Sequence, residues 1–315
     1  MRILVTGGAG FIASHVADAY IRLGHAVAVV DDLSRGFRHN VNSSATFYQG
    51  DIRDREFLEQ VFAEVEPEVV NHHAAQMDVR RGVREPLFDA SVNILGSVNL
   101  LETAVAHKTR HFVYISTAGA AYGEPKTLPA SEDCPINPIT PYGISKHTVE
   151  HYLYTFAVLY GISYVVLRYG NVFGPRQSSK GEAGVFAMFS EQMLAGIQPV
   201  IYGDGTKLRD YVYIDDVVAA NIAALEDGGN EVFNIGSGVP TSDDQVFCLV
   251  RGLLGLTGLS PRYVPRRPGE IERIYLDISK ARRLLGWEPK VPLEAAARQT
   301  VAFFQQSQPT LFHAV

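Results

Sequence analysis

Residues 1–16 read MRILVTGGAGFIASHV, and this stretch decides the fold. The apolar, β-branched run Ile3–Thr6 is typical of a short buried strand. A glycine-rich turn follows at once, and the periodicity after it predicts a helix over Ile12–Leu23. Small residues recur every three positions from Gly7, as needed for a tight turn, close backbone approach to a ligand and close helix packing. The free N–H groups at the start of such a helix suit a diphosphate.

The same alternation of strand and helix continues through the first two-thirds of the chain. Further strands are predicted at Ala26–Asp31, Glu68–His72, His111–Ser116 and Ser163–Tyr169. Helices are predicted between them at Arg55–Glu64, Ser91–Ala106 and Ser145–Tyr160. Such an order implies right-handed crossovers and a parallel sheet covered on both faces. The expected fold class is therefore α/β, a Rossmann-type doubly wound parallel sheet.

After Asn171 the sequence pattern changes, because glycine and proline cluster in loops between shorter elements. A helix at Asp215–Leu225 and a strand at Val232–Asn234 are expected to return to the large sheet. We therefore predict two interleaved domains. Residues 1–170 with about 212–238 would form the first, and residues 171–211 and 239–315 a smaller C-terminal α+β substrate-binding domain.

Composition excludes several classes of partner. The formal net charge of -6 gives no basic surface for nucleic acid or an anionic membrane. No apolar run approaches the ~20 residues that span a bilayer, and the N-terminus lacks the pattern of a secretory signal. The two cysteines, Cys134 and Cys248, show neither metal-ligand nor disulfide spacing. A cytoplasmic protein is expected.

A second motif carries chemistry. Tyr142 and Lys146 are four residues apart, so they lie on one face of a helix. Positive charge from Lys146 would lower the pKa of the phenol from ~10 toward working pH. A phenolate of this kind can take a hydroxyl proton while hydride leaves the same carbon.

The glycine turn and the Tyr-x-x-x-Lys pair together resemble the extended short-chain dehydrogenase/reductase family, in particular its UDP-glucose (UDP-galactose) 4-epimerases. The resemblance implies bound NAD. Asp31 would accept the ribose hydroxyls and disfavour a 2′-phosphate, although it could instead cap a turn and Arg35 could tolerate NADP. The cofactor-binding residues it implies are Gly7, Gly10, Phe11, Ile12, Asp31, Asp32, Asp51, Ile52, His73, Ala74, Ala75, Gln76, Asn93, Tyr142, Lys146 and Tyr169.

Two of these residues call for comment. His73 stands where the family has an apolar residue, and a lone histidine there is expected to be a packed ring with one nitrogen satisfied. Asn93 resembles an asparagine that braces the active-site strand and helix.

The family's third catalytic group is a hydroxyl at the end of the fifth strand. Counted back from Tyr122, its usual position falls on Ala118, which is a departure. We assign the role to the adjacent Thr117 and expect Ser116 to be buried and structural. An ordered water at Ala118 is the alternative.

The resemblance also implies a sugar-nucleotide site. Its substrate-binding residues would be Thr117, Tyr142, Asn171, Tyr202, Arg209 and Arg267. Arginine suits a diphosphate because its planar fork binds oxygens in pairs. Asp215 and Asp216 are interpreted as a helix N-cap and a first-turn acid, so no metal is assigned.

The implied reaction is inversion at C4 of a nucleotide sugar, most simply a UDP-hexose, through a transient 4-keto sugar. Dehydratase chemistry is disfavoured because Gly119 and Ala120 stand where that class carries an acid. The alternatives are a UDP-glucuronate or UDP-N-acetylglucosamine 4-epimerase, a nucleotide-4-keto-sugar reductase and, from another class, a non-catalytic NAD-sensing regulator. A homodimer through the 91–106 and 145–160 helices is expected by resemblance, although their apolar residues could face the sheet.

Overall fold

The computed structural model describes residues 1–178, 184–226, 229–267 and 270–311, and of residues 307–311 only the backbone. Seven strands form the main sheet in the order β10-β6-β5-β4-β1-β2-β3, and every pairing in it is parallel. These strands are β1 (Arg2–Thr6), β2 (Ala26–Asp31), β3 (Thr46–Gln49), β4 (Val69–His72), β5 (His111–Thr117), β6 (Ser163–Tyr169) and β10 (Glu231–Ile235). The doubly wound parallel sheet predicted from the sequence is confirmed.

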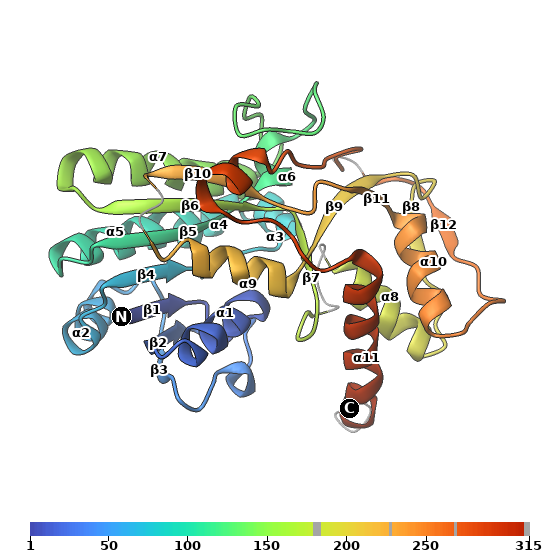
Figure 1. Cartoon of the computed structure of the whole chain (residues 1–315), viewed down its shortest axis with the longest axis horizontal. Coiled ribbons are helices and arrows are strands. Elements are labelled where there is room, and N and C mark those ends of the chain that lie inside the picture. The colour runs from blue at the N-terminus through green and yellow to red at the C-terminus, as the bar shows by residue number, and fades with distance from the viewer. Residues whose placement is uncertain (179–183, 227–228, 268–269, 312–315) are drawn as a thin grey trace.

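Helices cover both faces of this sheet (Figure 1). One face carries α1 (Phe11–Arg22) and α9 (Ile214–Ala223), and the other α2 (Arg55–Val65), α5 (Ser97–Ala106) and α7 (Pro141–Tyr160). Successive strand residues enter opposite cores: Ile3 and Val5 pack on the first face and Leu4 on the second. Burial on both faces explains why the strands read as continuous apolar runs.

The predicted elements differ from the observed ones mainly at helix ends. Helix α7 begins at Pro141 rather than Ser145, because the Thr140 hydroxyl accepts a hydrogen bond from Gly143 N and Pro141 occupies the first turn. Tyr142 therefore lies in the first turn of this helix. The helix expected over 91–106 contains a π-helical turn, η2 (Ser91–Gly96), before α5 begins.

Smaller sheets and three helices form the rest of the chain, together with the short elements on the loops. The strands are β7 (Asn171–Phe173), β9 (Leu208–Tyr213) and β11 (Pro240–Ser242) in one sheet, and β8 (Val200–Tyr202) and β12 (Arg262–Val264) in another. The helices are α8 (Val185–Leu194), α10 (Asp243–Leu253) and α11 (Leu293–Leu311). The short elements are η1 (Arg38–Asn40), α3 (Val79–Arg84), α4 (Pro86–Ala90), α6 (Ala118–Tyr122) and η3 (Ala281–Leu285).

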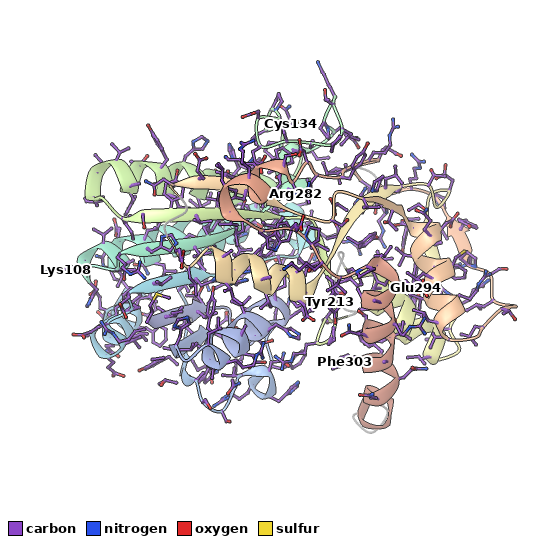
Figure 2. All side chains as sticks on the ribbon, viewed as in Figure 1. Lys108, Cys134, Tyr213, Arg282, Glu294 and Phe303 are labelled. Carbon is purple, nitrogen blue, oxygen red and sulfur yellow. The ribbon has the colours of Figure 1, made fainter. Side chains whose placement is uncertain are left out.

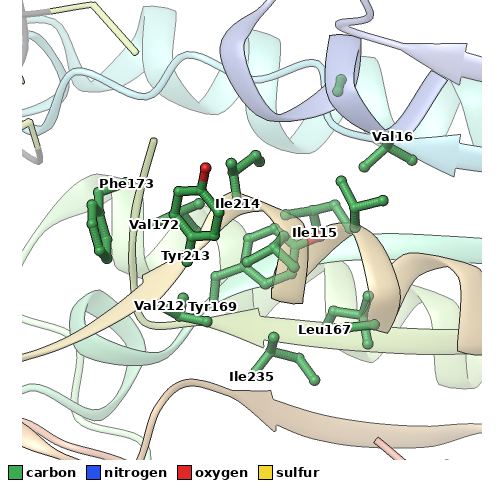
Figure 3. Close-up of a cluster of buried hydrophobic side chains, with 14 of the residues drawn as sticks. Val16, Ile115, Leu167, Tyr169, Val172, Phe173, Val212, Tyr213, Ile214 and Ile235 are labelled. Carbon is green, nitrogen blue, oxygen red and sulfur yellow. The ribbon is translucent and has the colours of Figure 1, made fainter. Parts of the chain in front are cut away.

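The large and small parts share one hydrophobic core. Figure 3 shows Ile115 and Leu167 of the main sheet in the same buried cluster as Val172 and Val212 of the smaller one. Figure 2 shows Tyr213, at the end of β9, beside α11, and its hydroxyl hydrogen-bonds Gln299 at 3.0 Å. The two parts are therefore packed together rather than joined by a linker.

Several local expectations can now be compared with the structure. Cys134, on the loop after α6 (Figure 2), and Cys248 are both free thiols. The predicted N-cap at Asp215 is wrong, since Tyr213 caps α9 and both aspartates lie in its first turn. The Asp216 carboxylate instead accepts hydrogen bonds from the backbone N–H groups of Lys290 and Val291. In the part of the chain that the structure describes, no helix is long and apolar enough to cross a membrane.

Candidate functional site

A cavity of about 1130 Å³ opens at the carboxyl ends of the main-sheet strands and continues into the smaller part. Nineteen of the predicted site residues line it: Gly7, Gly10, Phe11, Ile12, Asp31, Asp32, Asp51, Ile52, His73, Ala74, Ala75, Gln76, Thr117, Tyr142, Lys146, Tyr169, Asn171, Arg209 and Arg267. Asn93 and Tyr202 do not line it. The cavity is large enough for two extended ligands end to end.

The glycine turn is shaped for close approach of a ligand. Gly7 has φ +71°, and a Cβ there would lie 2.7 Å from the backbone nitrogen of Ala74. Gly10 caps α1, and no side chain hydrogen-bonds the first N–H groups of that helix. These N–H groups and the positive end of the helix dipole are therefore available to an anion.

Asp31 combines the two roles that the sequence left open. Its carboxylate accepts hydrogen bonds from the backbone N–H groups of Ala9 at 3.0 Å and Leu33 at 2.8 Å, so it braces the glycine turn. It also lines the cavity at the end of β2. Burial raises the pKa of this carboxyl group. Arg35 is paired with Asp78 at 2.9 Å.

Two further acids of the predicted site are held by their own loops. Asp32 accepts from both the backbone N–H and the hydroxyl of Ser34. Asp51 forms an ion pair with Arg53, and hydrogen bonds from this arginine lower the pKa of Asp51. Both carboxylates keep an edge toward the cavity.

The turn after β4 contains two histidines with opposite environments. His72 is satisfied, with Thr6 Oγ1 at 2.7 Å from Nδ1 and Ser97 Oγ at 2.9 Å from Nε2. Both ring nitrogens of His73 are buried and, within the described residues, have no partner. The expectation of one satisfied nitrogen on His73 is therefore wrong. Burial, with Lys146 nearby, lowers the pKa of His73 to about 3, so its ring is neutral.

Asn93 holds the backbone of this turn through two hydrogen bonds to Gln76. Its Oδ1 accepts from Gln76 N at 2.8 Å, and its Nδ2 donates to Gln76 O at 2.9 Å. Since its side chain is buried outside the cavity lining, Asn93 holds the turn in place rather than facing a ligand.

Tyr142 and Lys146 both reach the cavity from α7. Burial, aided by the negative charge of Asp89, raises the pKa of Tyr142 to about 12. The sequence-based expectation was the opposite, and burial decides the direction in this structure. Burial also lowers the pKa of Lys146 to about 7, against the raising effects of Glu150 and Asp89. The Lys146 ammonium lies 4.3 Å above the ring of Tyr114.

The buried lysine makes stability depend on pH. In the unfolded chain Lys146 keeps its proton up to pH about 10.5, so folding releases a proton between about pH 7 and 10.5. The ligand-free protein therefore gains stability as pH rises through this window. Below the window it carries the full free-energy cost of burying the charged Lys146. At about 1.4 kcal/mol per pH unit this cost is several kcal/mol.

We expect Lys146→Met to raise the melting temperature of the ligand-free protein at pH 6 and to lose that advantage by pH 10. Thermal unfolding at both pH values measures this. Lys108→Met, which changes an exposed lysine at the end of α5 (Figure 2), is the matched control and should show no such pH dependence. A difference between Lys146→Met and the native protein that stays constant with pH would contradict the account.

At the end of β5, three consecutive residues have different environments. Ser116 is a buried residue of the cavity wall, and its hydroxyl donates to Glu150 Oε1 at 2.6 Å, as expected for a structural hydroxyl. Thr117 lines the cavity, and no hydrogen bond to a described residue occupies its hydroxyl. Ala118 is 0% exposed and packs in the core, away from the cavity lining.

A buried ionic cluster behind β5 was missed by the sequence analysis. Glu150 accepts from Arg168 Nε at 3.0 Å, from Ser116 and from His147. Although burial favours the neutral acid, these hydrogen bonds lower the pKa of Glu150 to about 2. Arg168 continues the cluster to the hydroxyl of Tyr122 at 2.9 Å. Because the partners come from different elements, no local sequence spacing indicates them.

At the far end of the cavity the predicted arginines are partly engaged. Three backbone carbonyls, of Leu208, Ile271 and Glu272, accept from the terminal nitrogens of Arg209. Two of its about five N–H donors remain. The Arg267 guanidinium lies 3.4 Å from the ring centroid of Tyr202. Tyr202 therefore contacts a residue of the cavity wall, although it does not line the cavity itself. Residues 268–269, which follow Arg267, lie outside the described residues.

The same end holds three polar atoms that sequence reasoning missed. Tyr211 Oη, Asp243 Oδ1 and Gln177 Oε1 are buried without a hydrogen-bond partner among the described residues, and all three side chains line the cavity. Lys207 pairs with Asp243 at 3.1 Å and Glu270 at 3.3 Å. Unpartnered buried polar atoms are costly, so they indicate a polar ligand at this end.

Among the described residues, no group of three or more His, Cys, Asp or Glu side chains could hold a metal ion.

The glycine turn with its free N–H groups, the Tyr–Lys pair and the polar far pocket all lie in one cavity.

Comparison with known proteins agrees with this geometry. The model of the NAD dependent epimerase/dehydratase family matches residues 3–236. The UDP-glucose 4-epimerase of Mycolicibacterium smegmatis is 43% identical over 97% of this chain and 99% of its own. The Thermotoga maritima UDP-glucose 4-epimerase, solved with UDP-glucose, is 50% identical, with a TM-score of 0.96 over 98% of this chain and all of its own.

The Thermus thermophilus UDP-glucose 4-epimerase, solved with NAD, is 41% identical, with a TM-score of 0.91 over 97% of this chain and 99% of its own. With a family model matching most of the chain and relatives matching nearly all of it, the chain belongs to the NAD dependent epimerase/dehydratase family.

Proposed function

We propose that this protein is a UDP-glucose 4-epimerase that inverts C4 of UDP-glucose and UDP-galactose with tightly held NAD. The observation that carries the proposal is that Tyr142, Lys146 and Thr117 line the same cavity as the glycine turn and Arg267. The similarity to epimerases solved with NAD and with UDP-glucose supports it. A role in galactose metabolism follows from this substrate pair.

The residues present fit NAD. Gly7 lets the turn pack directly on the backbone of Ala74, and the uncapped start of α1 suits a diphosphate. Asp31 would hold the adenosine ribose, and Asp51 with Ile52 the adenine. The turn over His73–Gln76, braced by Asn93, and Tyr169 would line the nicotinamide end. When bound, NAD supplies the acceptor and donor of the C4 hydride.

The chain's own groups manage the proton and the orientation of the sugar. Tyr142 takes the proton of the sugar O4 in the first half-reaction and returns it in the second. Lys146 holds positive charge near this oxygen, and Thr117 donates a hydrogen bond to it. Between the two halves the 4-keto sugar must present its other face, so the protein has to hold it by the diphosphate end alone.

The far pocket is suited to that anchoring role. We assign the diphosphate to Asn171, Arg209 and Arg267, and the nucleoside end to the region of Tyr202. On this basis residues 1–170 with about 212–238 form the NAD-binding part, and residues 171–211 and 239–315 the sugar-nucleotide part. Residues 179–183, 227–228, 268–269 and 312–315 of these ranges lie outside the described structure.

The experiment is a turnover assay of the purified protein against UDP-, dTDP- and GDP-sugars, with no NAD added after desalting. Interconversion of UDP-glucose and UDP-galactose is expected to be fastest. Activity only with added NADH on 4-keto sugars would identify a reductase instead. If UDP-glucuronate or UDP-N-acetylglucosamine turned over faster than UDP-glucose, that sugar nucleotide would be assigned as the substrate instead.

Asp31→Ser is expected to shift cofactor choice toward NADP. The change removes a ribose acceptor and a charge that repels a 2′-phosphate. Since a hydrogen bond to a charged group contributes ~1.5–3 kcal/mol, NAD affinity should fall roughly 10-fold or more. Fluorescence titrations with NADH and NADPH measure both constants.

Asp133→Ser is the control for Asp31→Ser, because Asp133 is exposed and lies outside the cavity lining. If the native protein already binds NADPH as tightly as NADH, Asp31 does not set the choice.

We also propose a homodimer formed through α5 and α7. Large apolar side chains stand exposed on these adjacent helices, among them Leu95 at 66% just before α5 and Val158 at 67% on α7. Tyr154 and Leu159 extend the same surface. An apolar surface of this kind is typical of an interface between subunits.

A further inference from the structure

Helix α4 carries a carboxylate that the proposed mechanism does not use. Asp89 is 0% exposed. Its Oδ2 accepts from Gln76 Nε2 at 3.0 Å, and its Oδ1 accepts from Ser145 Oγ at 2.7 Å. Within the described residues no lysine, arginine or histidine forms an ion pair with it. A buried carboxylate with only neutral donors is costly, so a purpose beyond packing is expected.

The space around this carboxylate is closed on its third side by α3. A Cβ on Gly82 would lie 2.9 Å from Asp89 Oδ2, so the glycine allows α3 to pack directly over the acid. Water is thereby excluded, and the charge acts through a medium of low dielectric constant.

Both hydrogen-bond partners belong to the candidate active site. Gln76 lines the cavity in the turn after β4. Ser145 lies on α7 between Tyr142 and Lys146, three residues from the first and one from the second. Asp89 therefore ties the proposed cofactor turn to the helix that carries the Tyr–Lys pair.

The other charged groups near this pair are largely compensated. On α7, Glu150 is neutralised by Arg168. On α3, Arg81 is paired with Glu85 and stacks on the ring of Phe88. In the β4 turn, His73 is neutral at ordinary pH.

Asp89 is therefore a buried carboxylate without an ion-pair partner among the described residues, and it is hydrogen-bonded to the helix that carries the pair. A nearby negative charge disfavours a phenolate and favours an ammonium. Consistent with this, Asp89 raises the pKa of both Tyr142 and Lys146.

We propose that Asp89 is a positioning residue that locks α7 to the cofactor turn and places a negative charge beside the Tyr142–Lys146 pair. The proposal rests on the proposed function, because it assigns Tyr142 the proton transfer. Burial alone keeps the phenol neutral at ordinary pH in the empty site, so the charge of Asp89 acts on the pH at which the loaded site forms its base.

Asp89→Asn tests the charge with little change of shape. An asparagine can keep both hydrogen bonds by accepting from Gln76 and donating to Ser145. The readout is ¹⁹F NMR of ligand-free protein labelled with 3-fluorotyrosine, with the Tyr142 signal assigned by Tyr142→Phe. We expect its titration midpoint to fall by about 1 pH unit, and the acid limb of the kcat profile to move to lower pH with it.

Ser145→Ala is the matched control, because it breaks the link to α7 and keeps the charge. It should lower kcat and leave the Tyr142 midpoint in place. If Asp89→Asn lowers kcat equally at every pH and leaves the midpoint unchanged, Asp89 is only structural and the proposal is overturned. Asp89→Ala carries the same expectation if the asparagine variant does not fold.

The NMR midpoint is read without substrate. A shifted midpoint in a protein that does not epimerise UDP-glucose would therefore overturn the proposed function and leave the charge effect standing.

Discussion

Tyr142→Phe is expected to lower kcat by roughly 10²–10⁴-fold, the usual contribution of a positioned acid or base. The phenol lies in the first turn of α7, lines the cavity, and shares its helix face with Lys146. Phenylalanine keeps the ring and therefore the packing. Affinity for NADH and for UDP should stay close to that of the native protein, and the loss should appear in kcat rather than in KM. Steady-state kinetics with direct titration of both ligands measure this.

Tyr20→Phe is the matched control. Tyr20 is fully buried outside the cavity lining, and its hydroxyl donates to Asn221 O at 3.1 Å. The control should lose stability and keep kcat. Retention of more than about a tenth of native turnover in Tyr142→Phe would remove Tyr142 from the mechanism.

Thr117→Val is expected to lower kcat by roughly 10²-fold, as for the loss of one well-placed hydrogen bond in a transition state. Valine keeps the branched shape and removes only the hydroxyl. Thr117 lies where β5 ends, its side chain lines the cavity, and no described residue occupies its hydroxyl. It can therefore donate to a ligand oxygen at no cost to the fold. Turnover at saturating substrate is the measurement.

The neighbours of Thr117 supply the controls. Ser116→Ala removes the hydrogen bond to Glu150 and should reduce the melting temperature more than kcat. Ala118→Ser places a hydroxyl in a fully buried site outside the cavity, so it should destabilise the protein without accelerating the reaction. A silent Thr117→Val together with a faster Ala118→Ser would return the catalytic hydroxyl to position 118.

The fold could be predicted because its signals are local. Strands such as Ile3–Thr6 and Ser163–Tyr169 are continuous apolar runs, and the glycine turn and Tyr142–Lys146 have fixed spacings. The start of α7 was misplaced by four residues because Thr140 and Pro141 cap it on a loop that has no periodicity.

The environment of each site residue could not be predicted, because it depends on distant segments. His73 and His72 are adjacent in sequence, yet among the described residues only the ring nitrogens of His72 have partners, Thr6 and Ser97. The environment of Asp89 is formed only when α3, α4 and α7 pack together. The direction of the Tyr142 pKa was likewise decided by burial, which a sequence pattern does not reveal.

At the substrate end, too, the partners of the site residues could not be predicted from the sequence. Arg209 is predicted to bind a diphosphate, and the pattern did not reveal that its guanidinium also donates to the carbonyls of Leu208 and Ile271. Tyr211 and Asp243 each carry a buried oxygen with no partner in the described structure, and neither falls in a pattern that predicts binding.

The central claim is that one cavity oxidises and then reduces the same C4 without releasing the cofactor. The most direct test is turnover of UDP-glucose deuterated at C4, in ordinary water and without added NAD, followed by mass spectrometry and ¹H NMR of the product. The account predicts UDP-galactose with the deuterium still at C4. Product that has lost its deuterium, or no UDP-galactose at all, would contradict it.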